Sequence, residues 1–261
     1  MNRRLLIAVS LLVALSACTS ATVPHGTLYQ VSLASALVER DYEGETTLGE
    51  LLRHGDFGLG TVDRLDGELI VLKGTAYKAR SDGSVVEVPP DETTPFAVIT
   101  RFRTDSQISI DQPMGIRDLE RLIDRTVDNP NLFYALRIDA RIPAVTVRSV
   151  PAQSPPFRNL VEVVAEQRTW TREDVSGTIV GFRSPPYVGT MNVPGYHWHF
   201  LSDDRSQGGH VLSATLDRGA VDIDPLRTWI VVLPSDRAFG KLDLAKDHRD
   251  ELEVVEKSGT E

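Results

Sequence analysis

The sequence predicts an α+β fold, in which a larger mixed β-sheet domain with helices is followed by a smaller, mostly antiparallel β-sheet domain. The 261 residues are 41% hydrophobic and 25% charged, which is typical of a globular chain long enough for one large domain or two small ones. With 19 glycines and 15 prolines, turns recur between short apolar runs of strand length. The proline-rich residues 151–156 are the clearest linker, so we expect domains at 27–157 and 158–261.

The first residues have the three parts of a secretory signal. Arg3 and Arg4 give a cationic start, residues 5–15 form an apolar run too short to span a bilayer, and small residues precede Cys18. A cysteine directly after Leu-Ser-Ala resembles the bacterial lipoprotein signal, in which this cysteine becomes the lipidated first residue. We therefore expect a signal peptide at 1–17, a lipidated tether at 18–26, and an exported, membrane-anchored lipoprotein. A plain secretory signal cleaved nearby is the alternative.

The charge balance argues against a nucleic-acid partner. The formal net charge is −9, and loss of residues 1–17 would leave 26 basic against 37 acidic residues, a net charge of −11. The chain has no basic stripe that could release counterions from phosphates. Cys18 is the only cysteine, so no internal disulfide can form and the fold depends on its core.

The first half reads mainly as strands joined by tight turns. We expect strands near 28–33, 60–62, 68–72, 85–88 and 96–100, with Asp-Gly hairpin turns at 66–67 and 82–83. A hydroxyl cap, an early glutamate and a closing glycine predict a short helix over 46–55. Apolar residues at helical spacing predict another over 114–127. Residues 133–150 read as two strands interrupted near Pro143.

The second half is predicted to contain a helix at 160–167 and strands at 177–182, 198–201, 211–216 and 229–233. Residues 246–257 read as a charged terminal helix whose acidic side chains face solvent. Three further histidines have no partner at metal-ligand spacing. His25 falls in the tether, and we expect His54 and His248 on the surface.

The stretch Tyr-His-Trp-His-Phe at 196–200 is the most informative in the chain. On a strand, residues two apart face the same side, so His197 and His199 present a pair of imidazoles. A turn over 203–209 would return a second strand that brings His210 beside them. Three neutral nitrogens with open positions suit a catalytic zinc, and also iron, manganese or nickel. From spacing alone, a polar strand face is the alternative.

Four separated segments resemble the acetolactate decarboxylase family. They are Gly-Asp-Phe-Gly-Leu-Gly-Thr at 55–61 with Leu-Asp-Gly-Glu-Leu at 65–69, the run at 147–153, Gly-Thr-Ile-Val-Gly-Phe at 177–182, and 193–211 around the histidines. The resemblance extends from about Tyr29 to Glu256 and leaves out Cys18. It implies a larger mixed-sheet domain, a smaller antiparallel one, and a metal site between them.

The resemblance also implies roles for individual residues. It makes the three histidines the ligands of one zinc ion per chain and places a C-terminal glutamate, Glu256, near the metal. Glu251 and Glu253 lie close by, so this last assignment is loose. The full set of implied site residues is Thr61, Glu68, Arg148, His197, His199, His210 and Glu256.

The implied activity is the zinc-dependent decarboxylation of (S)-2-acetolactate to (R)-acetoin and carbon dioxide, a step of the butanediol pathway. A metal-stabilised enediolate would form without an organic cofactor. Arg148 offers a planar fork to the carboxylate or to the developing oxyanion, and Glu68 or, as second choice, Glu256 delivers the proton. The sequence leaves open which small 2-hydroxy-3-oxo acid is the natural substrate. It also leaves open the oligomeric state, a homodimer being one option.

Other interpretations remain at this point. The chain could be a metal- or solute-binding lipoprotein without catalysis, in which Glu68 and Arg148 need not converge on the metal. A metal-dependent hydrolase fits less well, because no glutamate accompanies the histidines on a helix. Taken alone, Glu68 could be a solvated strand residue and Arg148 a surface cation beside Asp139.

Overall fold

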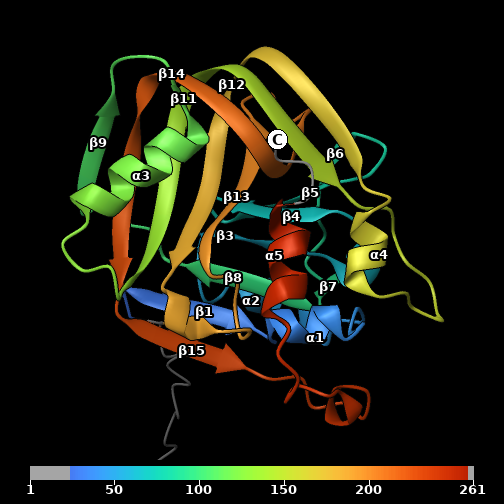
Figure 1. Ribbon diagram of the computed structural model, residues 1–261. Helices are drawn as coiled ribbons and strands as arrows, with labels where there is room; N and C mark the ends of the chain where they lie inside the picture. Colours follow the sequence, from blue (N-terminus) through green and yellow to red (C-terminus); the bar gives the residue numbers. More distant parts are fainter. Residues whose placement is uncertain (1–23, 258–261) are drawn as a thin grey trace, which may run out of the picture.

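The computed structural model describes residues 24–257, and two β-sheets dominate it (Figure 1). The predicted signal and Cys18 lie outside the described residues. A seven-stranded sheet and a six-stranded sheet face one another. A small third sheet pairs β2 (Thr46–Thr47) with β7 (Thr93–Thr94).

The first sheet has the strand order β15-β1-β8-β3-β4-β5-β6. It is mixed, because β1 runs parallel to β15 while its other neighbours are antiparallel. Its strands are β1 (Thr27–Val31), β3 (Phe57–Thr61), β4 (Glu68–Leu72), β5 (Thr75–Ala79), β6 (Val85–Glu87), β8 (Phe96–Thr100) and β15 (Thr228–Val232).

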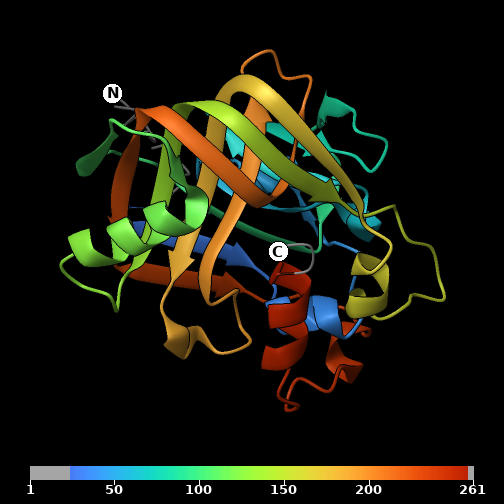
Figure 2. The same cartoon turned by 45° about the horizontal axis from the view of Figure 1, so that its top comes forward.

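The second sheet has the order β10-β14-β11-β12-β13, with β9 added to β14, and its strands pair antiparallel throughout the described residues. Because β14 pairs with both β11 and β13, the strands β11, β12, β13 and β14 form a closed ring of four strands. Figure 2 shows the long strands arching over the first sheet. The strands are β9 (Ser106–Ile110), β10 (Met114–Gly115), β11 (Phe133–Ser149), β12 (Arg168–Ser184), β13 (Gly195–Ser202) and β14 (Gly208–Leu226).

The helices are short and lie outside the sheets. Three of them, α1, α4 and α5, contact one another, and α3 packs on the second sheet (Figure 1). None of the helices within 24–257 is both long and apolar enough to cross a membrane. Their bounds are α1 (Ala34–Val38), α2 (Leu48–Leu51), α3 (Ile116–Thr126), α4 (Leu160–Val164) and α5 (Arg249–Lys257), with 3-10 turns η1 (Asp63–Leu65), η2 (Pro186–Val188) and η3 (Phe239–Lys241).

The largest apolar cluster joins the two sheets. Phe57 and Ile70 of the first sheet belong to the same cluster as Phe182 and Leu201 of the second, and all four are buried. Burying one such side chain contributes about 1.5–3 kcal/mol, so this layer holds the sheets together. The predicted α+β class, with one mixed and one antiparallel sheet, is confirmed.

The expected boundary at residue 157 does not follow the division between the sheets. β11 precedes this boundary but pairs within the second sheet, and β15 follows it but pairs with β1 in the first. The proline-rich residues 151–156 only connect β11 to α4. Chain order misleads here, because strand partners are set by register and by the buried face.

Several predicted elements have different lengths. β11 runs through Pro143 as one strand, with register shifts between Arg141 and Ala144 that absorb the missing N–H of the proline. The helix expected over 46–55 is only α2, whose predicted hydroxyl cap is confirmed, since Thr47 accepts from the N–H of Glu50 at 3.2 Å. The strands expected at 177–182 and 211–216 are parts of the longer β12 and β14.

Candidate active site

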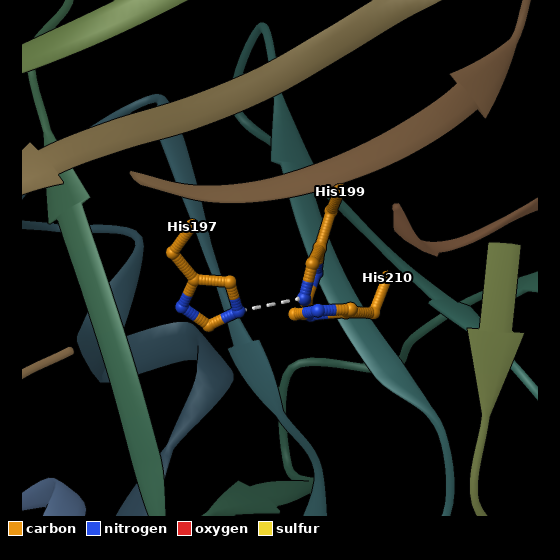
Figure 3. A group of neighbouring side chains, drawn as sticks. All are labelled: His197, His199 and His210. Atoms are coloured by element: carbon orange, nitrogen blue, oxygen red, sulfur yellow. Dashed lines mark hydrogen bonds between the residues drawn. The ribbon is translucent and has the colours of Figure 1, made fainter. Parts of the chain in front are cut away.

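Three histidines project from neighbouring strands toward one point (Figure 3). His197 and His199 are two residues apart on β13, so their side chains share one face. His199 lies directly opposite His210 on β14, and His210 lies directly opposite Arg148 on β11. Strand register therefore places three imidazoles and a guanidinium on adjacent strands at one level of the sheet.

The spacing of the ring nitrogens suits a shared metal ion. The Nε2 atoms of His197 and His199 are 3.2 Å apart, and one ligand atom from each of the three histidines lies within 4.8 Å of the others. Two nitrogens bound tetrahedrally to zinc at about 2.0–2.1 Å would be about 3.3 Å apart. The donor set and its geometry thus fit a metal held by His197, His199 and His210.

Backbone carbonyls orient two of the rings. The Nδ1 atom of His199 lies 2.8 Å from the carbonyl oxygen of Leu69 on β4, and the ring of His210 hydrogen-bonds the backbone of Glu256. An imidazole that donates one N–H to a carbonyl leaves its other nitrogen free as a metal ligand. The first sheet and α5 therefore both set the orientation of the ligands carried by the second sheet.

Burial keeps the three imidazoles neutral. It lowers the pKa of His197 to about 3, with a further contribution from the Arg148 guanidinium. Burial likewise holds the pKa values of His199 and His210 well below the ordinary value. Neutral imidazole is the form that binds a metal, so the site is ready for one at neutral pH.

Glu68 and Thr61 reach the site from the first sheet. They are direct partners in the β3–β4 hairpin, so both side chains leave the same face. The Oε2 atom of Glu68 lies 3.5 Å from Nε2 of His199, and the Thr61 hydroxyl donates to the carbonyl of Gly67 at 3.1 Å. Glu68 is thus not a solvated strand residue, and burial raises the pKa of its carboxyl to about 7.

Glu256 approaches the histidines from α5. Its Oε2 atom lies 3.7 Å from Nε2 of His210 and 3.9 Å from Nε2 of His197, and burial raises the pKa of its carboxyl to about 7. The prediction that the acidic residues of this helix all face solvent is therefore wrong. Leu252 and Val255 are buried, and Glu256 lies on the same inward side of α5. Glu251 instead pairs with Lys246 at 2.8 Å.

Arg148 is a buried cation whose charge acts on the carboxyl groups of Glu68 and Glu256, although it forms no ion pair with either. Only 4% of the residue is exposed, and its Nη1 atom donates to Oε1 of Gln167 at 3.3 Å. In the described part of the chain, no ion pair joins the Arg148 guanidinium to a carboxylate, and its Nε has no hydrogen-bond partner. The surface cation considered beside Asp139 is instead Arg137, whose Nε lies 3.0 Å from that carboxylate. The charge of Arg148 lowers the pKa values of Glu68 and Glu256 against the effect of burial, but neither carboxylate is bound to the guanidinium, which is therefore suited to an anionic ligand.

These groups line one cavity, which we call the inner chamber. Thr61, Glu68, Arg148 and Glu256 contribute to its wall with His197 and His210. Much of the remaining wall is apolar, including Leu65, Phe96, Val150, Leu160, Val164 and Leu252. The chamber therefore offers a few converging polar groups in an apolar surrounding, the usual character of a small-molecule site.

Comparisons with known proteins agree with this geometry. Residues 28–246 match the family model described as alpha-acetolactate decarboxylase. The chain is 43% identical over 231 residues to the alpha-acetolactate decarboxylase of Raoultella terrigena, covering 88% of this chain and 89% of the relative. It is 40% identical over 230 residues to that of Methanosarcina mazei, covering 88% and 80%. The chain belongs to the alpha-acetolactate decarboxylase family.

A solved structure supports the assignment. The crystal structure of alpha-acetolactate decarboxylase from Bacillus subtilis superposes with a TM-score of 0.87 at 37% identity, covering 89% of this chain and all of the other. The family model ends before α5, so the position of Glu256 in this family member rests on the structure.

The sequence did not point to two residues that support the site. His248, expected on the surface, is fully buried, with Nε2 3.3 Å from a carboxylate oxygen of Glu39. It thereby links the start of α5 to the end of α1. His248 lies four and seven residues before Leu252 and Val255, and this spacing indicates that the three residues share the buried face of a helix. Gln167, which holds the Arg148 guanidinium, had no such signal.

A steric requirement explains why a glycine precedes His210. Gly209 has a φ of +148°, and a Cβ there would lie 2.6 Å from the carbonyl oxygen of Arg148. Only glycine allows β14 to approach β11 this closely. The double glycine at 208–209 thus helps bring His210 and Arg148 together, beyond the turn role that the sequence suggested.

Proposed function

We propose that the chain decarboxylates (S)-2-acetolactate to (R)-acetoin and carbon dioxide at a zinc ion held by His197, His199 and His210. The observation that carries the proposal is the position of Arg148. A buried guanidinium, which forms no ion pair with a carboxylate of residues 24–257, lies on the strand next to His210, where an anionic substrate would bind it. A protein that only stored metal would not need a buried guanidinium beside its metal ligands.

Zinc is proposed because three neutral imidazoles with room for further oxygen ligands are typical of catalytic zinc sites. When bound, the metal would act as a Lewis acid toward the ketone and hydroxyl oxygens of the substrate. A single three-histidine group in the described residues supports one ion per chain. Iron, manganese and nickel accept the same ligands, so metal analysis has to decide between them.

Arg148 orients and activates the substrate in this proposal. Its planar fork can bind the carboxylate or the oxygen on which charge develops, and the hydrogen bond from Nη1 to Gln167 holds the guanidinium in place. The apolar wall of the inner chamber excludes water, which strengthens this interaction. Interactions that strengthen as the charge moves are the ones that increase the rate.

The reaction needs one proton. When the bond to the carboxylate breaks, carbon dioxide leaves without the electron pair, and the carbon left behind takes up a proton. Glu68 is our first choice as donor, because its hairpin is rigid and the raised pKa of about 7 retains the proton near neutral pH. Delivery from one side only would give a single enantiomer of acetoin. Glu256 is the second choice.

The decisive experiment measures carbon dioxide release from racemic acetolactate, with and without prior chelation. We expect consumption of one enantiomer, loss of turnover after chelation, and recovery on addition of zinc. The stoichiometry of bound metal should be one per chain. Metal binding without any carbon dioxide release would favour the alternative, a metal- or solute-binding lipoprotein.

Glu68→Gln should retain zinc and fold normally but decarboxylate about 100-fold more slowly, because it keeps the shape of the side chain and removes the acid. The acid form of Glu68 is present below its raised pKa of about 7 and is lost above it, so the wild-type rate should also fall at alkaline pH. The measurement is steady-state turnover with chiral analysis of acetoin and metal content. If Glu68→Gln kept the wild-type rate and the enantiomeric purity of acetoin, Glu68 would not be the proton donor and Glu256 would become the leading candidate.

We further propose that Cys18 is acylated and anchors the mature protein to the outer side of a bacterial inner or outer membrane. The support is the charged start, apolar run and Leu-Ser-Ala-Cys ending of residues 1–18. Cys18→Ser should leave the protein unprocessed or release it from the membrane fraction. Unchanged fractionation and an unchanged mass of the mature protein would speak against the lipid anchor.

A further inference from the structure

The inner chamber has no exposed residue in its wall. Each of its lining residues is buried or only partly exposed, including Glu68, His197 and Glu256. A substrate must therefore pass between these partly exposed side chains or through an adjoining cavity to reach the histidines.

A second cavity lies on the other side of α5, and we call it the α3–α5 cleft. Its rim includes exposed residues from both helices, Arg117 on α3 and Arg249 and Glu253 on α5. Its floor includes the buried Trp198, which is 4% exposed. Figure 1 shows the two helices on either side, with β13 between them.

The cleft ends at groups that also line the inner chamber. Val193, His210, Leu252 and Glu256 belong to the walls of both cavities. The α3–α5 cleft thus connects exposed side chains at its rim with one of the three candidate metal ligands.

Strand pairing explains why the cleft opens at this place. β13 pairs with β14 only from His199 opposite His210 onward to Leu201 opposite Gly208. In the other direction the two strands diverge, since residues 195–198 pair only with β12 and β14 continues along β11. The divergence begins at the histidines, so the resulting gap leads to them.

The rim is compatible with a small anionic ligand, and the floor is firmly built. Arg117 pairs with Glu120 at 3.2 Å, and two arginines face three acidic residues in the whole lining, so the cleft is only weakly negative. The indole N–H of Trp198 donates to Glu120 at 2.9 Å, and the Tyr196 hydroxyl donates to the carbonyl of the same residue at 3.0 Å. These bonds tie α3 to the strand that carries two of the histidines.

We propose that the α3–α5 cleft is the route by which the small anionic substrate reaches the metal centre and by which acetoin and carbon dioxide leave. This inference rests on the proposed function for the identity of the ligand. The route itself follows from the shared wall, the exposed rim and the divergence of β13 and β14.

The test places a reversible plug in the cleft. In a Cys18→Ser background, Glu253→Cys introduces a single thiol at the rim, and Val254→Cys places one on the same helix outside the cleft. Each zinc-loaded variant is compared with its own adduct, formed either with a bulky disulfide reagent or with a methylthio group. The readouts are kcat/KM for acetolactate and the rate at which pyridine-2,6-dicarboxylate removes the zinc.

The bulky adduct at position 253 should lower both quantities by about tenfold or more, and reduction should restore them, because association becomes limiting. The methylthio adduct, and either adduct at position 254, should have little effect. If no variant turns over acetolactate, the proposed function fails, while the zinc-removal rate still tests the route. Complete labelling at position 253 with both quantities unchanged would overturn the proposal. Arg117→Cys on the opposite wall provides a second position if Glu253→Cys folds poorly.

Discussion

Replacing His199 with alanine is expected to abolish metal binding and decarboxylation together. The side chain is fully buried, and its Nε2 atom lies 3.2 Å from that of His197, so no other group or solvent can take its place easily. Loss of an outer partner of a metal ligand typically costs 10- to 100-fold in affinity, and loss of the ligand itself should exceed about 100-fold. Metal content after gel filtration and turnover of acetolactate measure the two effects.

His54→Ala is the matched control for this experiment. His54 is partly buried and stacks on Tyr29 at a ring distance of 3.8 Å, away from the three-histidine group. The His54→Ala variant should retain a full complement of metal even if the substitution lowers stability. A His199→Ala protein with normal metal content would show that the metal is held elsewhere.

Arg148→Lys is expected to bind zinc normally and to lose about 100-fold or more in kcat/KM. Lysine keeps the positive charge but loses the planar fork, so it cannot bind two oxygens at once or keep the hydrogen-bond geometry to Gln167. Removing one well-placed donor to a developing oxyanion costs about 100- to 1,000-fold in other enzymes. Steady-state kinetics with metal analysis would separate this loss from a loss of zinc.

Arg137→Lys provides the comparison on the same strand. Arg137 pairs with Asp139 and Asp222, so a lysine there still finds carboxylates and should leave the kinetics nearly unchanged. If both substitutions changed kcat/KM only slightly, Arg148 would have no role in the reaction. A large effect at position 148 alone would support its role in binding the substrate or the developing charge.

The sequence by itself determined the parts of the site that depend on local periodicity. Residues two apart on a strand must share a face, so the pair His197 and His199 could be recognised before any tertiary contact was known. The turn after them pointed to His210, and the resemblance of the surrounding segments added Thr61, Glu68, Arg148 and Glu256. The structure brings these five residues to one chamber. The α+β class followed from turn spacing and alternating apolar runs for the same local reason.

Only the tertiary structure decided which strands form which sheet and which charged residues are buried. β11 and β15 lie in sheets that chain order did not predict, because pairing depends on distant partners. Likewise His248 looked solvated from its charged neighbours but is fully buried, and Arg148 resembled many surface cations but is buried. Burial is a property of the packed surroundings. It shifts pKa values, and no local pattern of residue types specifies it.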